Sequence, residues 1–230
     1  MCQEKIVFQI KGTPLIKFQS SERIDDLRKG HLYAKTLGYY RKLEEETGDA
    51  EIGDGYEAMI HINEGTIKNS ETGEEIALND DLIMTTNSHD YVFCMFGIYP
   101  NTMSFEFTEK QKEKMLSFGN TALIVKDSDE FIRRICDAAV KKGYTPHFGA
   151  VQYYDPSIDN GNMIISLMRG MWTIAFWKRK SYTYQQEGRF VFTPGDGKSD
   201  HIDLDIGDIS DITEIMPAKD VLNAMLKKEM

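Results

Sequence analysis

The side chains best suited to chemistry lie in residues 178–195, which read KRKSYTYQQEGRFVFTPG. Gln185, Glu187 and Arg189 stand two residues apart, and an apolar run follows them. Side chains alternate between the two faces of a β-strand, so an extended backbone would place this amide, carboxylate and guanidinium on one face. The pattern predicts a polar row at the start of a strand, closed by a Pro-Gly turn.

This polar row has two interpretations. In the first, Glu187 and Arg189 form a solvated ion pair on an edge strand, worth about 0–1 kcal/mol. In the second, the carboxylate is held at the lip of a sheet and faces a hollow. The basic residues 178–180, beside Tyr182 and Tyr184, are likewise open to two interpretations. They form a solvated helix end, or they hold a phosphate or a nucleic-acid strand.

Composition limits the class of protein. The chain has 230 residues, 41% of them hydrophobic and 11% aromatic, which is enough for a core in a single domain spanning residues 1–230. The net charge of −10 argues against broad electrostatic binding to nucleic acid or to an anionic membrane. Three widely separated cysteines are typical of reduced thiols in a cytoplasmic protein. No secretory leader and no apolar run of membrane-spanning length is recognised.

The sequence contains no recognisable metal-binding or nucleotide-binding motif. Residues 44–57 are acidic and contain three glycines, which predicts a solvated surface loop or a mobile loop beside a pocket. Their order does not match a calcium-binding EF-hand, and the five histidines lack the spacing of metal ligands. No P-loop or dinucleotide-binding glycine motif occurs. We therefore expect no metal site.

Apolar periodicity and capping residues predict the elements that must position the polar row. Strands are expected at residues 6–10, 15–18, 31–34, 59–62, 66–68, 75–78, 82–85, 91–96, 121–125, 148–154, 185–192, 201–206 and 212–216. Helices are expected at residues 21–30, 108–118 and 127–143 and after Pro217, a short helix or a turn at residues 36–43, and turns of hairpin type at residues 63–65 and 72–73. Residues 163–177 fit one buried helix or two strands meeting at Arg169–Gly170. Together, these strands and helices predict an α+β domain with a central mixed, largely antiparallel sheet flanked by helices.

The order of several segments resembles a known bacterial family. These segments are GDGYE at residues 53–57, FCMF at 93–96, VQY at 151–153, KSYTYQQEGRF at 180–190 and ITEIM at 212–216. The family is the uncharacterised domain of unknown function two-nine-seven-one, whose relatives occur with mobile and phage-related genes. Its usual pattern has Glu-x-Glu followed by Trp-Arg, whereas this chain has Gln185 and Gly188 at the differing positions.

The segment QQEGRFVFTPG also resembles the Q-x-E strand of ADP-ribosyltransferases, and residues 16–33 resemble their first strand and helix. The resemblance implies that Glu187 holds the nicotinamide ribose of NAD and stabilises an oxocarbenium-like transition state, while Gln185 orients the acceptor. The family's Arg or Tyr-His on the first strand is replaced by Phe18–Gln19. Gln19 and Ser20 then become candidates for binding NAD, with an aromatic clamp from Tyr39, Tyr40 or Tyr56.

Three functional hypotheses follow. The first is a cytoplasmic, NAD-binding ADP-ribosyltransferase-like protein linked to phage defence or mobile elements, with a protein or nucleic-acid acceptor and no membrane partner. The second is a non-catalytic module in which the surface from Lys178 to Arg189 holds a nucleotide, another phosphate-bearing small molecule or a nucleic acid. The third is a structural protein of a phage or mobile element.

Overall fold

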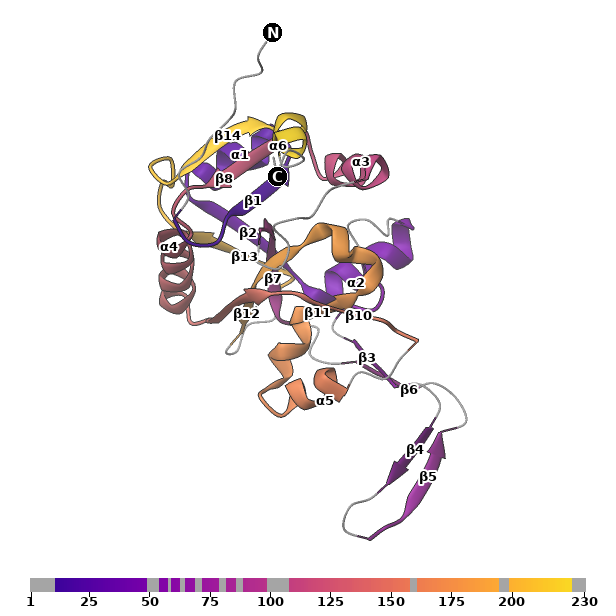
Figure 1. Cartoon of the computed structure of the whole chain (residues 1–230). Helices are drawn as coiled ribbons and strands as arrows, with labels where there is room; N and C mark the ends of the chain where they lie inside the picture. The colour runs from indigo at the N-terminus through magenta and orange to yellow at the C-terminus, as the bar shows by residue number, and fades with distance from the viewer. Residues whose placement is uncertain are drawn as a thin grey trace.

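The structure is a computed structural model that describes residues 11–48, 54–57, 59–62, 65–68, 72–78, 82–85, 89–98, 108–157, 161–194 and 199–224. An antiparallel sheet forms its centre, and helices pack against both faces (Figure 1). The expected α+β class is therefore confirmed. In the described part of the chain, no helix is both long and apolar enough to cross a membrane. The strand expected at residues 6–10 lies outside the described residues.

Eight strands make up the main sheet, in the order β13-β2-β7-β1-β8-β14, with β12 and β9 continuing from β7. Their bounds are β1 (Leu15–Gln19), β2 (His31–Thr36), β7 (Tyr91–Gly97), β8 (Thr121–Val125), β9 (Thr145–Ala150), β12 (Glu187–Thr193), β13 (His201–Asp205) and β14 (Thr213–Pro217). All the pairings within this sheet are antiparallel. β12 lies between β7 and β9 and is therefore an inner strand, which corrects the expectation of an edge.

The sheet divides at β7. One edge of β7 pairs with β12 from Tyr91 to Phe96. The opposite edge pairs with β2 only at Tyr91 and Val92, and with β1 only at Phe96 and Gly97. Within the described chain, Phe93–Met95 therefore have no strand beside them on that edge. We call this opening between β1 and β2 the fork, and α1 (Ser21–Arg28) connects the two strands across it.

Side-chain caps begin several helices where the sequence predicts them. The other helices are α2 (Leu37–Thr47), α3 (Glu109–Ser117), α4 (Ser128–Lys141), α5 (Gly161–Leu167) and α6 (Ala218–Ala224). Thr36, Thr108 and Asp127 each accept a hydrogen bond from a backbone N–H of the first turn. α2 runs to Thr47, four residues beyond the expected end, because the first glycine of the acidic segment is Gly48, whose φ of 67° closes the helix.

Two other expectations are wrong. Residues 148–154 are not one strand, because β9 ends at Ala150 and β10 (Gln152–Tyr154) pairs instead with β11 (Trp177–Arg179). Residues 163–177 are neither a single helix nor two strands. α5 ends at Leu167, Gly170 has a φ of 133°, and the 3-10 helix η2 (Met171–Phe176) follows, so this glycine interrupts the helix.

A pair of two-stranded ladders projects from the body of the molecule (Figure 1). It contains β3 (Met59–Ile62), β4 (Gly65–Lys68), β5 (Glu75–Leu78) and β6 (Leu82–Thr85). β4 pairs with β5, as a hairpin around residues 72–73 requires, but β3 pairs with β6. Among the described residues β3 and β4 do not pair with each other, and residues 63 and 64 of the turn expected between them lie outside the described chain.

Three apolar clusters cover the sheet. One face packs against α1 and α4 through a single large cluster. The other face carries two clusters, one beneath α3 and α6 and one beneath α2, α5 and η2. Phe190 lies at the centre of the first cluster, with its ring 4.5 Å from that of Phe148 and 6.1 Å from that of Phe131.

We predict that Phe190→Ala lowers the free energy of unfolding by about 3–5 kcal/mol, because it leaves a cavity among packed rings. Val140→Ala, on the exposed side of α4, is the control and should change it by about 0.5 kcal/mol or less. Chemical denaturation followed by circular dichroism measures both. Equal effects of the two substitutions would contradict this account of the core.

Candidate functional site: a cavity at the fork

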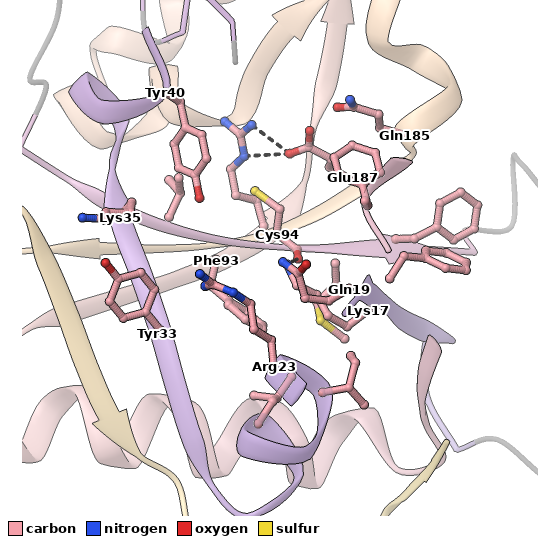
Figure 2. A pocket seen from close by; sticks show the side chains of 18 of the residues that line it. Lys17, Gln19, Arg23, Tyr33, Lys35, Tyr40, Phe93, Cys94, Gln185 and Glu187 are labelled. Atoms are coloured by element: carbon pink, nitrogen blue, oxygen red, sulfur yellow. Dashed lines mark hydrogen bonds and ion pairs between the residues drawn. The ribbon is translucent and has the colours of Figure 1, made fainter. Parts of the chain in front are cut away.

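A cavity of about 950 Å³ lies at the fork. Figure 2 shows its two walls: β1 and α1 contribute Lys17, Gln19 and Arg23, and β2 and α2 contribute Tyr33, Lys35 and Tyr40. Cys94, Gln185, Glu187 and Arg189 also line it. Residues from both faces of the sheet share one cavity because, in the described part of the chain, no strand closes the sheet beside Phe93–Met95.

The strand register places a row of polar side chains beside this cavity. Arg189 is paired with Cys94 and Glu187 with Phe96, and directly paired residues point to the same face. Glu187 and Arg189 therefore share a face, as the sequence predicts. Their polar row separates the two apolar clusters on that face.

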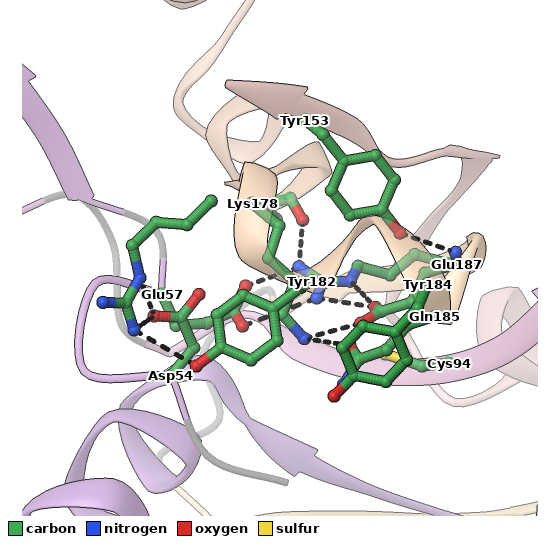
Figure 3. A network of polar contacts seen from close by, with 12 residues as sticks. Asp54, Glu57, Cys94, Tyr153, Lys178, Tyr182, Tyr184, Gln185 and Glu187 are labelled. Atoms are coloured by element: carbon green, nitrogen blue, oxygen red, sulfur yellow. Dashed lines mark hydrogen bonds and ion pairs between the residues drawn. The ribbon is translucent and has the colours of Figure 1, made fainter. Parts of the chain in front are cut away.

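Both oxygens of the Glu187 carboxylate are hydrogen-bonded in the buried network shown in Figure 3. Lys178 Nζ donates to Oε1 at 2.6 Å, and Arg189 donates to Oε2 through Nη2 at 2.8 Å and Nε at 3.1 Å. Only 6% of Glu187 and 1% of Arg189 is exposed. The pair is therefore buried, which corrects the interpretation of a solvated surface ion pair.

Arg189 is the centre of this network. Its Nη1 donates to Glu57 Oε1 at 2.5 Å and also to the carbonyl oxygen of Ala175. Lys178 Nζ also donates to Gln185 Oε1 at 2.7 Å. Gln185 belongs to the 3-10 helix η3 (Lys180–Gln185) and not to the strand, which corrects the predicted strand position. Gln185 and Glu187 are instead linked through Lys178, which donates a hydrogen bond to each.

Burial and charge act in opposite directions on these carboxyl groups. Burial alone would raise the pKa of Glu187, but the adjacent Arg189 and Lys178 hold that pKa well below its ordinary value of 4.5. Burial raises the pKa of Glu57, and Arg189 opposes this rise. Glu187 is therefore ionised, and two cations neutralise its charge.

The acidic segment near residue 54 is also fixed by arginine. Arg179 donates to Asp54 Oδ1 at 2.6 Å through Nη2 and at 3.0 Å through Nε. Asp54 and Glu57 are only 1% and 3% exposed, so this part of the expected solvated loop is buried. Within the described residues, no group of three or more potential metal ligands occurs.

The residues predicted to form the site do not all meet. Gln19, Tyr39 and Tyr40 line the same cavity as Gln185, Glu187 and Arg189. Among the other two candidates, Ser20 is exposed at the N-cap of α1, and Tyr56 lies with its ring 4.6 Å from the Arg179 guanidinium; neither lines the cavity.

Sequence reasoning missed three contributors. The sequence predicts Lys17 only as part of a strand, although alternation places it on the same face as the apolar Leu15, which is buried. Lys178 was assigned to a solvated helix end or a phosphate grip, but it is 4% exposed and belongs to β11. Tyr153 accepts a hydrogen bond from the Glu187 backbone N–H at 2.9 Å, which no local pattern indicated.

Comparison of this chain with known protein families, curated proteins and solved structures finds no match. Its function is therefore inferred from the cavity and the side chains around it.

We predict that Arg189→Met lowers the free energy of unfolding by about 3–5 kcal/mol at neutral pH, because it leaves the buried Glu57 without its ion-pair partner and Glu187 with Lys178 alone. Arg133→Met is the control, since Arg133 forms ion pairs on the exposed side of α4, and it should cost about 1 kcal/mol or less. Urea titration at pH 7 measures both. If both variants lost the same small amount of unfolding free energy, the result would contradict a buried network around Arg189.

The depressed pKa of Glu187 also predicts a dependence on pH. A carboxyl group whose pKa is lower in the folded protein stabilises the fold above its ordinary pKa of 4.5, and that stability is lost as the pH falls. The difference in unfolding free energy between the wild type and Glu187→Gln should therefore shrink from about pH 6 to about pH 3. A difference that stays constant over this range would show that the charge of Glu187 does not contribute.

Proposed function

We propose that this protein binds a ring-bearing small molecule of nucleotide type in the cavity at the fork. The observation that carries the proposal is an aromatic wall on a cavity of about 950 Å³, a volume within the usual range for ligand pockets. Tyr33 and Tyr39 flank Lys35, whose Nζ lies 5.5 Å and 4.9 Å from their ring centroids. Both tyrosines are 39% exposed, so each has ring surface available to a ligand.

NAD is the first ligand to test. The resemblance to ADP-ribosyltransferases suggests it, and Gln19, Tyr40 and Arg189 are candidates for binding it that line the cavity. The buried network supports the cavity from beneath, because Arg189 joins β12 to Glu57 and to the backbone of η2. A cavity whose lining is held in this way needs little reorganisation when a ligand enters.

ADP-ribosyl transfer is a second candidate. It is favoured because Glu187 and Gln185 both line the cavity. It ranks below binding because Lys178 and Arg189 already donate to both oxygens of Glu187. A carboxylate that two cations neutralise offers little stabilisation to a developing oxocarbenium ion.

We predict that NAD and adenosine bind the wild type in isothermal titration calorimetry, and that Tyr39→Ala weakens binding about three- to tenfold by removing a ring contact. Tyr56→Ala is the matched control, because Tyr56 is similarly exposed, at 37%, but does not line the cavity. It should change the affinity less than about twofold. The proposal fails if neither ligand binds at millimolar concentration, or if the two variants behave alike.

Release of nicotinamide from NAD tests the second candidate. We expect no release above the uncatalysed rate, because the charge of Glu187 is neutralised within the protein. Release by the wild type that disappears in Glu187→Gln, while NAD binding persists, would instead support transfer. Thermal unfolding of the variant must accompany the assay, since Glu187 also stabilises the buried network.

A further inference from the structure

Lys17 occupies an unusual position at the fork. It lies in the middle of β1, paired with the buried Leu123 of β8. Its Nζ donates to the carbonyl oxygen of Cys94 at 2.7 Å, on the edge of β7 that no described strand covers. The same ammonium group lies 4.6 Å from the ring centroid of Phe93. An ammonium group has three donors, so contacts to a neutral carbonyl and a ring leave donors for a ligand in the cavity.

Arg23 adds a second positive charge to the same wall. It is an exposed residue of α1 that lines the cavity, and Figure 2 shows its side chain reaching toward Phe93 on the side of Lys17 and Gln19. Burial lowers the pKa of Lys17 from its ordinary value of 10.5, and the charge of Arg23 lowers it further, although Cys94 and Glu187 act to raise it. Two cations that disfavour each other's charge are stabilised when an anion binds between them.

The other cations of the cavity already have carboxylate partners. Lys178 and Arg189 bind Glu187, and Lys35 Nζ lies 2.9 Å from Asp200 Oδ2. Among the residues that the structure describes, Lys17 and Arg23 line the cavity without an ion pair to any carboxylate. The cations of the cavity that have no ion pair in the described structure therefore lie on the β1–α1 wall, opposite the tyrosines of β2 and α2 (Figure 2). The carboxylates of Glu22 and Asp26 on α1 also line the cavity.

We infer that Lys17 and Arg23 form an anion subsite, which takes the phosphate or carboxylate group of the ligand while the tyrosine wall takes its ring. Assigning this anion to a nucleotide rests on the proposed function, whereas the subsite itself rests on the two cations. Lys17 approaches the anion as a compact charge oriented by the Cys94 carbonyl, and Arg23 can donate two parallel hydrogen bonds. The inferred ligand class is a phosphorylated nucleoside or a ring-bearing analogue with a carboxylate at the same end.

The test compares adenosine, ADP and inorganic pyrophosphate by isothermal titration calorimetry. Lys17→Gln and Arg23→Gln should each weaken the binding of ADP and of pyrophosphate about tenfold, the loss expected for one charge-assisted hydrogen bond. Both should leave adenosine binding within about twofold. Lys29→Gln is the matched control: Lys29 is exposed at the C-cap of α1 and does not line the cavity, so this variant should behave like the wild type.

Lys17 also satisfies a backbone carbonyl, so thermal unfolding of Lys17→Gln must be measured alongside binding. Arg23 is exposed, and Arg23→Gln therefore tests the subsite even if the Lys17 variant does not fold. The inference is overturned if pyrophosphate and ADP bind the wild type and Arg23→Gln equally, or if Lys29→Gln is weakened as much.

The two proposals fail in different ways. Adenosine binding without any pyrophosphate binding, and without any gain for ADP, rejects the anion subsite but keeps the ring-binding cavity. Pyrophosphate binding that depends on Lys17 and Arg23, with no binding of adenosine or NAD, supports the subsite and rejects a nucleotide as the ligand.

Discussion

A strand edge can pair with only one backbone at each position, and β7 divides one of its edges between two partners. β2 takes the end at Tyr91 and β1 takes the end at Gly97, so the middle of the edge has no neighbouring strand in the described structure. The unpaired carbonyl of Cys94 accepts its hydrogen bond from the side chain of Lys17. This shared edge explains why a cavity forms here, why Lys17 lies beside it, and why β1 and β2 form separate walls.

The second constraint is the polar row beside the fork. Buried charges require partners, and Arg189 has three: Glu187, Glu57 and the carbonyl of Ala175. A packed apolar core often stabilises a fold at least as well as such a network does. The position of this network beside a cavity is therefore more informative about binding than about stability. It also fixes Glu57, which precedes the projecting ladders, against the body of the protein.

The charge pattern in the cavity differs from the one expected from the Q-x-E motif. That motif predicts that the carboxylate of Glu187 is free to stabilise an oxocarbenium-like cation as the bond to nicotinamide breaks. In the structure Lys178 and Arg189 neutralise Glu187, while Lys17 and Arg23 line the cavity without an ion pair to a described carboxylate. This difference is why we propose a site for an anion beside an aromatic ring, and not a site that stabilises a cation.

Local signals in the chain were sufficient wherever neighbouring residues decide the structure. They located the caps at Thr108 and Asp127, and they placed Glu187 and Arg189 on one face of a strand, because capping and alternation act within a few residues. The tertiary structure decided which strands meet, and hence that β12 is an inner strand and that Lys178 is buried. Only the pairing of β7 with both β1 and β2 creates the fork, and pairing between strands so distant in sequence leaves no local pattern to read.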